Sequence, residues 1–91
     1  MTQQEAINSI TLALRKVLKR DGFEISIDTD LSDKKILDSL DRIVFLMELS
    51  ELTGKEFSED VDLVKIGLFK VANLADYLTG ARDINQFFPN V

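Results

Sequence analysis

A strongly apolar segment at residues 36–54 contains clear signals for the start and the end of a helix. Asp38 is suited to cap the helix start, because its carboxylate can accept hydrogen bonds from free backbone N–H groups, and Asp41 stands three residues later, as in a capping box. Residues 38–52 contain no proline or glycine, and Thr53 and Gly54 provide a left-handed stop. The sequence therefore predicts a helix of about four turns.

Helical spacing divides this segment into two sides. At about 100° per residue, Phe45, Leu46 and Leu49 form the centre of one side, which we expect to face the core together with Arg42, Ile43 and Thr53. The opposite side is more apolar than a solvated face needs to be, which favours a docking surface, although a helix buried on more than one side is the alternative. This side contains Leu40, Asp41, Val44, Met47, Glu48 and Glu51.

Composition excludes several kinds of chemistry. The chain has no cysteine and no histidine, so it cannot form disulfides, Cys/His zinc sites or a Ser-His-Asp triad by itself. The run 28–33 lacks the sixth-position glycine and twelfth-position glutamate of an EF-hand, with Asp33 and Ser39 at those places, so no metal site is expected. Acid pairs such as Asp38 with Asp41 have no evident pocket that would shift their pKa values. We therefore expect a protein without catalytic residues.

The charge is negative and uneven along the chain. The net charge is -5, but residues 1–20 carry four basic side chains and one acidic side chain, which leaves -8 for residues 21–91. This acidic body argues against nucleic acid as a partner and favours proteins with basic surfaces. The start lacks a secretory signal pattern, and no apolar run reaches the length of a membrane span. We expect a cytoplasmic protein without membrane insertion.

The remaining elements are also predicted to be helical. Thr2 and Glu5 form a capping box before a helix at roughly 3–19, which Asp21 and Gly22 should end. Residues 21–37 contain one strand-like alternation without a second strand to pair with, so we predict a long ordered loop.

Two further helices complete the predicted fold. A short helix capped by Ser58 should end near Ile66 and Gly67 and bury Val61 and Val64, with Leu63 as a further contact. A last helix, roughly 69–78, has no obvious cap and should bury Val71, Leu74, Ala75 and Leu78. The prediction is an all-α fold: a small bundle of three longer helices and one short helix, with a long loop between the first two.

The helix start at residue 38 resembles a known site. Asp38-Ser39-Leu40-Asp41, followed by Ile43, Leu46, Met47 and Glu48, is similar to the prosthetic-group site and second helix of acyl carrier proteins. On the residues alone, serine near a helix start is common for local hydrogen-bonding reasons. The resemblance implies that Ser39 receives 4'-phosphopantetheine from coenzyme A through a phosphopantetheinyl transferase, and that the arm carries acyl groups as thioesters.

The resemblance covers about Gln3 to Leu78 and sets the expected domain boundaries. We expect a carrier domain at 1–80 and a C-terminal tail at 81–91, with Phe87 and Phe88 packed on the bundle. The expected partners are the transferase and acyl-loading and acyl-processing enzymes with basic docking surfaces, and the carrier itself should be a monomer. Their contact residues would be Asp38, Leu40, Asp41, Val44, Met47, Glu48 and Glu51.

The pathway stays open at this point. Leu37 stands two positions before Ser39, where carriers of fatty-acid synthesis often have a small residue. Three functions remain: an acyl carrier of fatty-acid or specialised lipid metabolism, a discrete polyketide, aminoacyl or D-alanyl carrier, and a helical interaction module without a prosthetic group.

Overall fold

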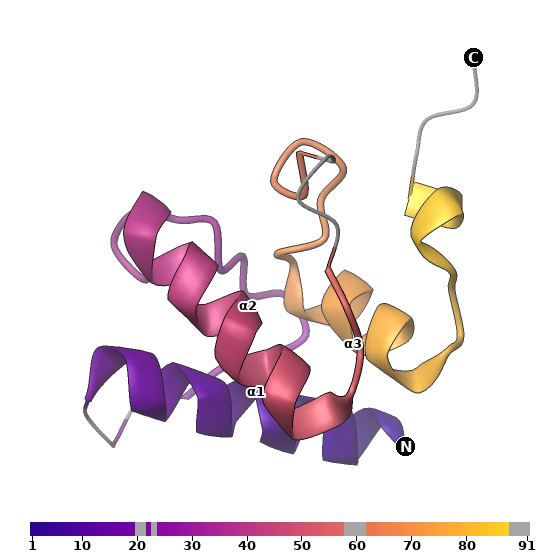
Figure 1. The fold of residues 1–91 in the computed structure, drawn as a ribbon, viewed down its shortest axis with the longest axis horizontal. Coiled ribbons are helices and arrows are strands. Elements are labelled where there is room, and N and C mark those ends of the chain that lie inside the picture. The colour runs from indigo at the N-terminus through magenta and orange to yellow at the C-terminus, as the bar shows by residue number, and fades with distance from the viewer. Residues whose placement is uncertain (20–21, 23, 58–61, 88–91) are drawn as a thin grey trace.

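Helices and turns make up the described part of the chain. The computed structural model describes residues 1–19, 22, 24–57 and 62–87. In chain order it contains α1 (Gln3–Leu18), α2 (Ser39–Thr53), α3 (Val71–Thr79) and a final 3-10 turn, η1 (Ile84–Phe87) (Figure 1). No strand occurs in these residues, which confirms the predicted helical class. None of their helices has both the length and the apolar character that crossing a membrane requires.

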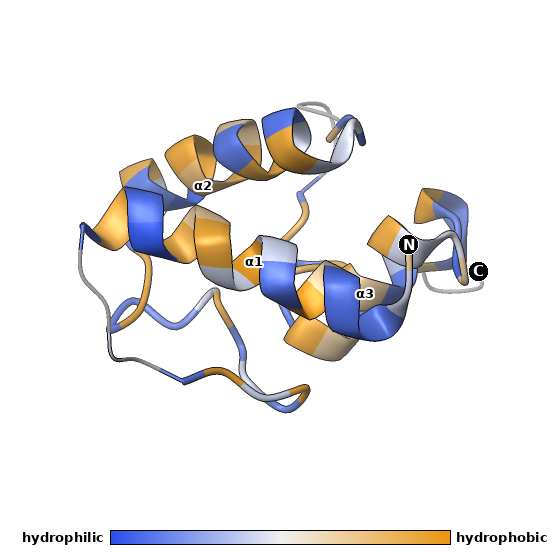
Figure 2. Cartoon of the chain, turned by 90° about the horizontal axis from the view of Figure 1, so that it is seen from below, coloured by the Kyte–Doolittle hydropathy of each residue, from blue (hydrophilic) through white to orange (hydrophobic). Residues whose placement is uncertain are grey.

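The core lies where α1 and α2 pack against each other. The two helices run side by side in opposite directions (Figures 1 and 2). Ile10 and Leu14 of α1 and Phe45 and Leu49 of α2 are fully buried. Alanines in α1, which the spacing of large apolar residues did not single out, are buried too, and their small side chains suit close helix contact.

Local capping chemistry sets the ends of α1 and α2. The Thr2 hydroxyl accepts from the Glu5 N–H at 3.2 Å, and the Glu5 carboxylate accepts from the Thr2 N–H at 3.0 Å, so the predicted capping box is confirmed. The first helix ends at Leu18, earlier than Asp21 and Gly22, because Lys19 adopts the left-handed conformation with φ 55°. Gly54 ends α2 as predicted, with φ 73°.

The long connection between α1 and α2 is held against the start of α3. The Leu31 N–H donates to the Phe69 carbonyl at 2.9 Å, and the N–H groups of Val71 and Ala72 donate to carbonyls of Thr29 and Ile27. These bonds use backbone donors that a side-chain cap would otherwise satisfy, which explains why the N-cap residue Lys70 makes no side-chain capping bond. The expectation of an ordered loop is therefore confirmed for its described residues.

The short third helix is not formed in the part of 58–67 that the structure describes. Residues 63–69 are turns, with backbone bonds that alternate between three-, four- and five-residue spacing, and Gly67 has φ 79°. Mixed spacing cannot build a regular helix, which needs repeated four-residue bonds. Leu63 is buried as expected, whereas Val64 is 39% exposed; Ser58 and Val61 lie outside the described residues.

The last helix and the tail pack as one unit. The predicted buried face of α3 is confirmed, although the helix begins at Val71, two residues later than expected. Phe87 of η1 is buried under the Arg82 guanidinium, whose carbon lies 4.1 Å from the ring centre, and Arg82 Nε donates to Asp76 Oδ2 at 3.2 Å. Packing of the tail is thus confirmed for Phe87, and Phe88 lies outside the described residues.

Candidate functional site

The start of α2 presents an exposed serine hydroxyl. Asp38 is the N-cap, and its Oδ1 accepts a hydrogen bond from the Asp41 N–H at 2.8 Å. Ser39 follows as the first helical residue and is exposed. Because Asp38 makes the capping bond, the Ser39 hydroxyl is not needed for helix initiation and remains accessible to another molecule.

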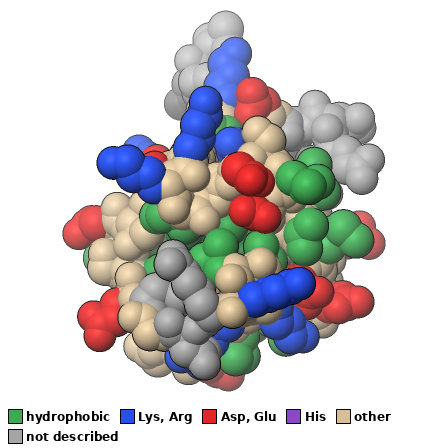
Figure 3. Space-filling view, turned by 90° about the vertical axis from the view of Figure 1, so that its left-hand side faces the viewer, with side chains coloured by type: hydrophobic (Ala, Val, Ile, Leu, Met, Phe, Trp, Pro, Cys, Tyr) green, Lys and Arg blue, Asp and Glu red, His purple; other side chains and the backbone are tan. Residues whose placement is uncertain are grey.

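An apolar stripe continues from Ser39 along the exposed side of α2. The exposed fractions are 69% for Leu40, 59% for Ile43, 40% for Val44 and 65% for Met47. The sequence predicted that Ile43 lies on the core side, and the structure contradicts this prediction. The side of α2 that contains Phe45 and Leu49 faces α1, whereas Ile43 lies near the edge of the exposed side. Figure 3, viewed from the side where α2 begins, shows hydrophobic side chains at the surface among acidic and basic ones.

The acids of the expected docking face divide into two groups. Asp38 and Glu51 are exposed, and Asp41 is half-buried. Glu48 instead turns toward α1, where its Oε2 lies 3.4 Å from Lys16 Nζ and its side chain is only 29% exposed. Glu48 therefore forms an ion pair between the two helices and offers less free charge to a partner than the exposed Asp38 and Glu51.

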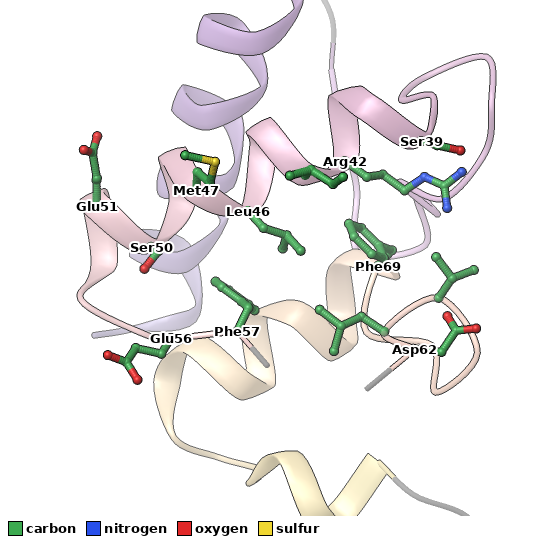
Figure 4. A pocket seen from close by; sticks show the side chains of 13 residues that line it. Ser39, Arg42, Leu46, Met47, Ser50, Glu51, Glu56, Phe57, Asp62 and Phe69 are labelled. Atoms are coloured by element: carbon green, nitrogen blue, oxygen red, sulfur yellow. The ribbon is translucent and has the colours of Figure 1, made fainter. Parts of the chain in front are cut away.

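A groove opens beside Ser39, between α2 and the segment that leads to α3. Its volume is about 870 Å³, within the range of small-molecule sites. The walls are mostly apolar, and the polar groups are Ser39, Arg42, Ser50, Glu51, Glu56 and Asp62 (Figure 4). The apolar lining residues are Ile43, Leu46, Met47, Phe57, Leu63, Val64 and Phe69. No sequence pattern predicted this groove, because its two walls come from separate segments.

Side chains of α3 hold the wall that faces α2. The Tyr77 hydroxyl donates to the Glu56 carbonyl at 2.6 Å, and the Phe57 and Tyr77 rings lie 5.5 Å apart. Partial burial, together with the nearby Asp83 and Glu56 carboxylates, raises the Tyr77 pKa, so the hydroxyl stays protonated and able to donate at neutral pH. Asn73 Nδ2 donates to the Gly67 carbonyl at 2.9 Å and fixes the turns of the same wall.

Arg42 places a positive charge in the groove. Its Nε is buried, and within the described residues it has no hydrogen-bond partner. In Figure 4 the guanidinium extends toward the end of the groove where Ser39 lies. A buried arginine N–H without a hydrogen-bond partner is costly, so this group is suited to bind an anion.

A comparison with protein-family models decides the family. The model of the phosphopantetheine attachment site matches residues 8–78 of this chain. The chain belongs to this family. Its prosthetic group is covalently attached 4'-phosphopantetheine, so the resemblance inferred from Asp38 to Glu48 is confirmed. Phosphopantetheine carrier domains are modified by phosphopantetheinyl transferases, act with partner enzymes and are typically not catalytic. No curated protein and no solved structure matches the chain significantly.

The residues at the start of α2 fit such a prosthetic group. A phosphodiester would lie near the positive end of the helix dipole, where backbone N–H groups point outward. Arg42, whose Nε has no hydrogen-bond partner within the described residues, lies one helical turn from Ser39, and the same serine lines the groove. The carrier domain thus has an exposed hydroxyl, a cation and an apolar recess in one place.

Proposed function

We propose that this carrier domain is an acyl carrier protein whose phosphopantetheine is attached to Ser39. The observation that carries the proposal is the exposed Ser39 hydroxyl at the edge of a mostly apolar groove. Ser50 also lines the groove but is half-buried. The proposed role is the transport of acyl intermediates between enzymes of fatty-acid, specialised lipid or polyketide synthesis in the cytoplasm.

In the loading reaction, Ser39 is the acceptor. Its Oγ forms a bond to the phosphorus of the phosphopantetheinyl group, the pyrophosphate bond of coenzyme A breaks and releases adenosine 3',5'-bisphosphate, and the hydroxyl proton passes to a base of the transferase. The chain contains no histidine or cysteine, and we assign activation of the hydroxyl to the transferase. Asp38 keeps the helix start in place while Ser39 reacts.

After loading, the groove favours apolar cargo. The bound group supplies a thiol that holds the cargo as a thioester. Leu46, Phe57 and Phe69 offer apolar surface on which a hydrocarbon chain would be removed from water, at about 0.8 kcal/mol for each buried methylene. This apolar surface supports acyl rather than aminoacyl cargo.

The exposed side of α2 is the proposed docking surface for partner enzymes. Leu40, Val44 and Met47 supply apolar contact, and the exposed Asp38 and Glu51 attract basic surfaces, which speeds encounter more than it deepens affinity. A small interface of this kind lets a monomeric carrier leave one enzyme for the next. Ile43 extends this surface beyond the residues expected from the sequence.

The attachment site can be tested by loading with a matched control. The wild type, Ser39→Ala and Ser50→Ala are each incubated with coenzyme A and a broad-specificity phosphopantetheinyl transferase, and their intact masses are measured. We expect one phosphopantetheinyl group on the wild type and on Ser50→Ala and none on Ser39→Ala, with unchanged helicity by circular dichroism. A mass gain on Ser39→Ala would refute the site, and no gain on the wild type would favour the helical interaction module.

A discrete aminoacyl or D-alanyl carrier is the second candidate. It is favoured by the carboxylates of Glu51, Glu56 and Asp62, which line the groove and could pair with an ammonium group. Intact-mass analysis of the protein purified from its native cell separates the two candidates. Acyl masses on the arm support the first, and aminoacyl masses support the second.

A further inference from the structure

Among the described residues, no hydrogen bond from Nε and no ion pair accounts for the position of the Arg42 guanidinium. It is half-buried in a mostly apolar groove, its Nε lacks a hydrogen-bond partner within the described residues, and the ion pairs found in that part of the chain join other side chains. Solvation does not require this half-buried position, because in an exposed conformation water could hydrate all five N–H donors of the guanidinium. Its placement therefore points to a ligand.

The geometry selects an anion attached at Ser39. Residues three apart on a helix have Cβ atoms about 5–6 Å apart, so the long Arg42 side chain can reach a group bonded to the Ser39 oxygen. Both residues line the same groove, and Figure 4 shows the guanidinium directed to the Ser39 end of it. Asp38 and Asp41, which lie beside Ser39 in the chain, would repel an anion there, and Arg42 is the basic side chain among the described lining residues that offsets them.

Resting on the proposed attachment at Ser39, we propose that Arg42 binds the phosphodiester of the attached arm and directs the arm into the groove. Nε and an Nη group can donate together to two phosphate oxygens, a planar arrangement that a lysine cannot reproduce. Binding at this end fixes the first part of the arm over Leu46 and Phe69, so that the cargo enters between α2 and the opposite wall. Arg42 is thus a positioning residue of the carrier.

A spectroscopic experiment reads the contact directly. Nitrogen-15 spectra of the Arg42 Nε–Hε group are recorded on the unloaded protein, on the protein carrying the free-thiol arm, and on forms carrying methyl-ended or carboxylate-ended acyl chains. Intact mass confirms loading before each spectrum, and Arg42→Lys identifies the signal. We expect the Arg42 signal to shift and its Hε exchange to slow by about tenfold with the free-thiol arm. The Arg82 signal, whose Nε already donates to Asp76, should stay in place.

A matched pair of variants tests the same contact through stability. Arg42→Gln and Lys35→Gln remove one positive charge each, and Lys35 is exposed in the loop before α2. Loading changes the melting temperature, and we expect this change to be about 2–6 °C less stabilising in Arg42→Gln than in the wild type. The difference between the two proteins should shrink in high salt. Lys35→Gln should behave as the wild type.

Each remaining outcome counts against the inference in a distinguishable way. If the wild type does not load, the attachment at Ser39 fails and this inference fails with it. If the protein loads but the Arg42 signal is unchanged, or the two variants give the same loading shift, only the role of Arg42 is overturned. A response with the carboxylate-ended chain alone would assign Arg42 to cargo recognition and overturn the phosphodiester contact.

Discussion

At the scale of single residues, Asp38 and Ser39 differ in what they do at the start of α2. Asp38 accepts the capping hydrogen bond from the Asp41 N–H, and Ser39 is exposed beside it, as the proposed attachment requires. The sequence predicted this arrangement because capping depends on residues close together in the chain. It did not predict that Glu48 turns to Lys16 or that Arg42 Nε has no hydrogen-bond partner in the described part of the chain, because both depend on how α2 is rotated against its neighbours.

Asp30 gives a pH-dependent prediction at the same scale. Hydrogen bonds from the Ser32 hydroxyl at 2.6 Å and the Ser32 N–H at 2.9 Å lower the pKa of Asp30 below its ordinary value. A lowered folded-state pKa favours the charged form, so its stabilising contribution is present above the unfolded pKa of about 3.9 and is lost as the pH falls below it.

The variant Ser32→Ala removes the larger of these two causes. The free energy of unfolding from urea titration should therefore fall less steeply in Ser32→Ala than in the wild type when the pH drops from about 5 to about 2. Because Asp30 is exposed, the difference should be small. Equal slopes would show that the Ser32 hydroxyl does not stabilise the Asp30 carboxylate.

At the scale of elements, local sequence signals predicted the ends of some helices better than others. Thr2 with Glu5, Asp38 and Gly54 define α1 and α2 locally, and these elements were predicted within one or two residues. In the described residues 62–67 the third predicted helix is not formed, because hydrogen bonds of mixed spacing and the left-handed Gly67 give turns, and Asn73 of α3 holds these turns through the Gly67 carbonyl. The groove was missed for the same reason, since it requires that segment to stand opposite α2.

The start of α3 gives a prediction at this scale. The N–H groups of Val71 and Ala72 donate at 2.9 and 3.0 Å to loop carbonyls, in place of a side-chain cap. Their amide hydrogens should therefore exchange with solvent as slowly as those in the middle of α3. Hydrogen exchange followed by NMR checks this, with exposed Lys34 as a fast-exchanging control. Fast exchange at Val71 and Ala72 would contradict capping by the loop.

At the scale of the whole molecule, the C-terminal turn is part of the folded unit. The family match ends at residue 78, yet Phe87 is buried and Arg82 contacts Asp76 and Asn73 of α3. Asn73 in turn bonds to Gly67 in the groove segment. This chain of contacts links the tail to the wall opposite α2. The packed structure therefore extends past the proposed boundary at residue 80, which lies close to the end of the family match.

Removing the Phe87 side chain tests this link. Phe87→Ala should lower the free energy of unfolding by about 2–3 kcal/mol, because the ring leaves the core and its contact with Arg82. Asn85→Ala, at an exposed position of the same turn, should change it by less than about 0.5 kcal/mol. Thermal unfolding of the two variants gives the comparison, and equal melting temperatures would show that the tail does not stabilise the domain.

The central claim is that Ser39 is the residue that bears the prosthetic group. Peptide mapping of the transferase-loaded wild type by fragmentation mass spectrometry measures this directly. The account predicts one phosphopantetheinyl group on the peptide that contains residues 36–42, with fragment ions that assign it to Ser39. A group assigned to Ser32, Ser50 or another side chain, with Ser39 unmodified, would contradict it.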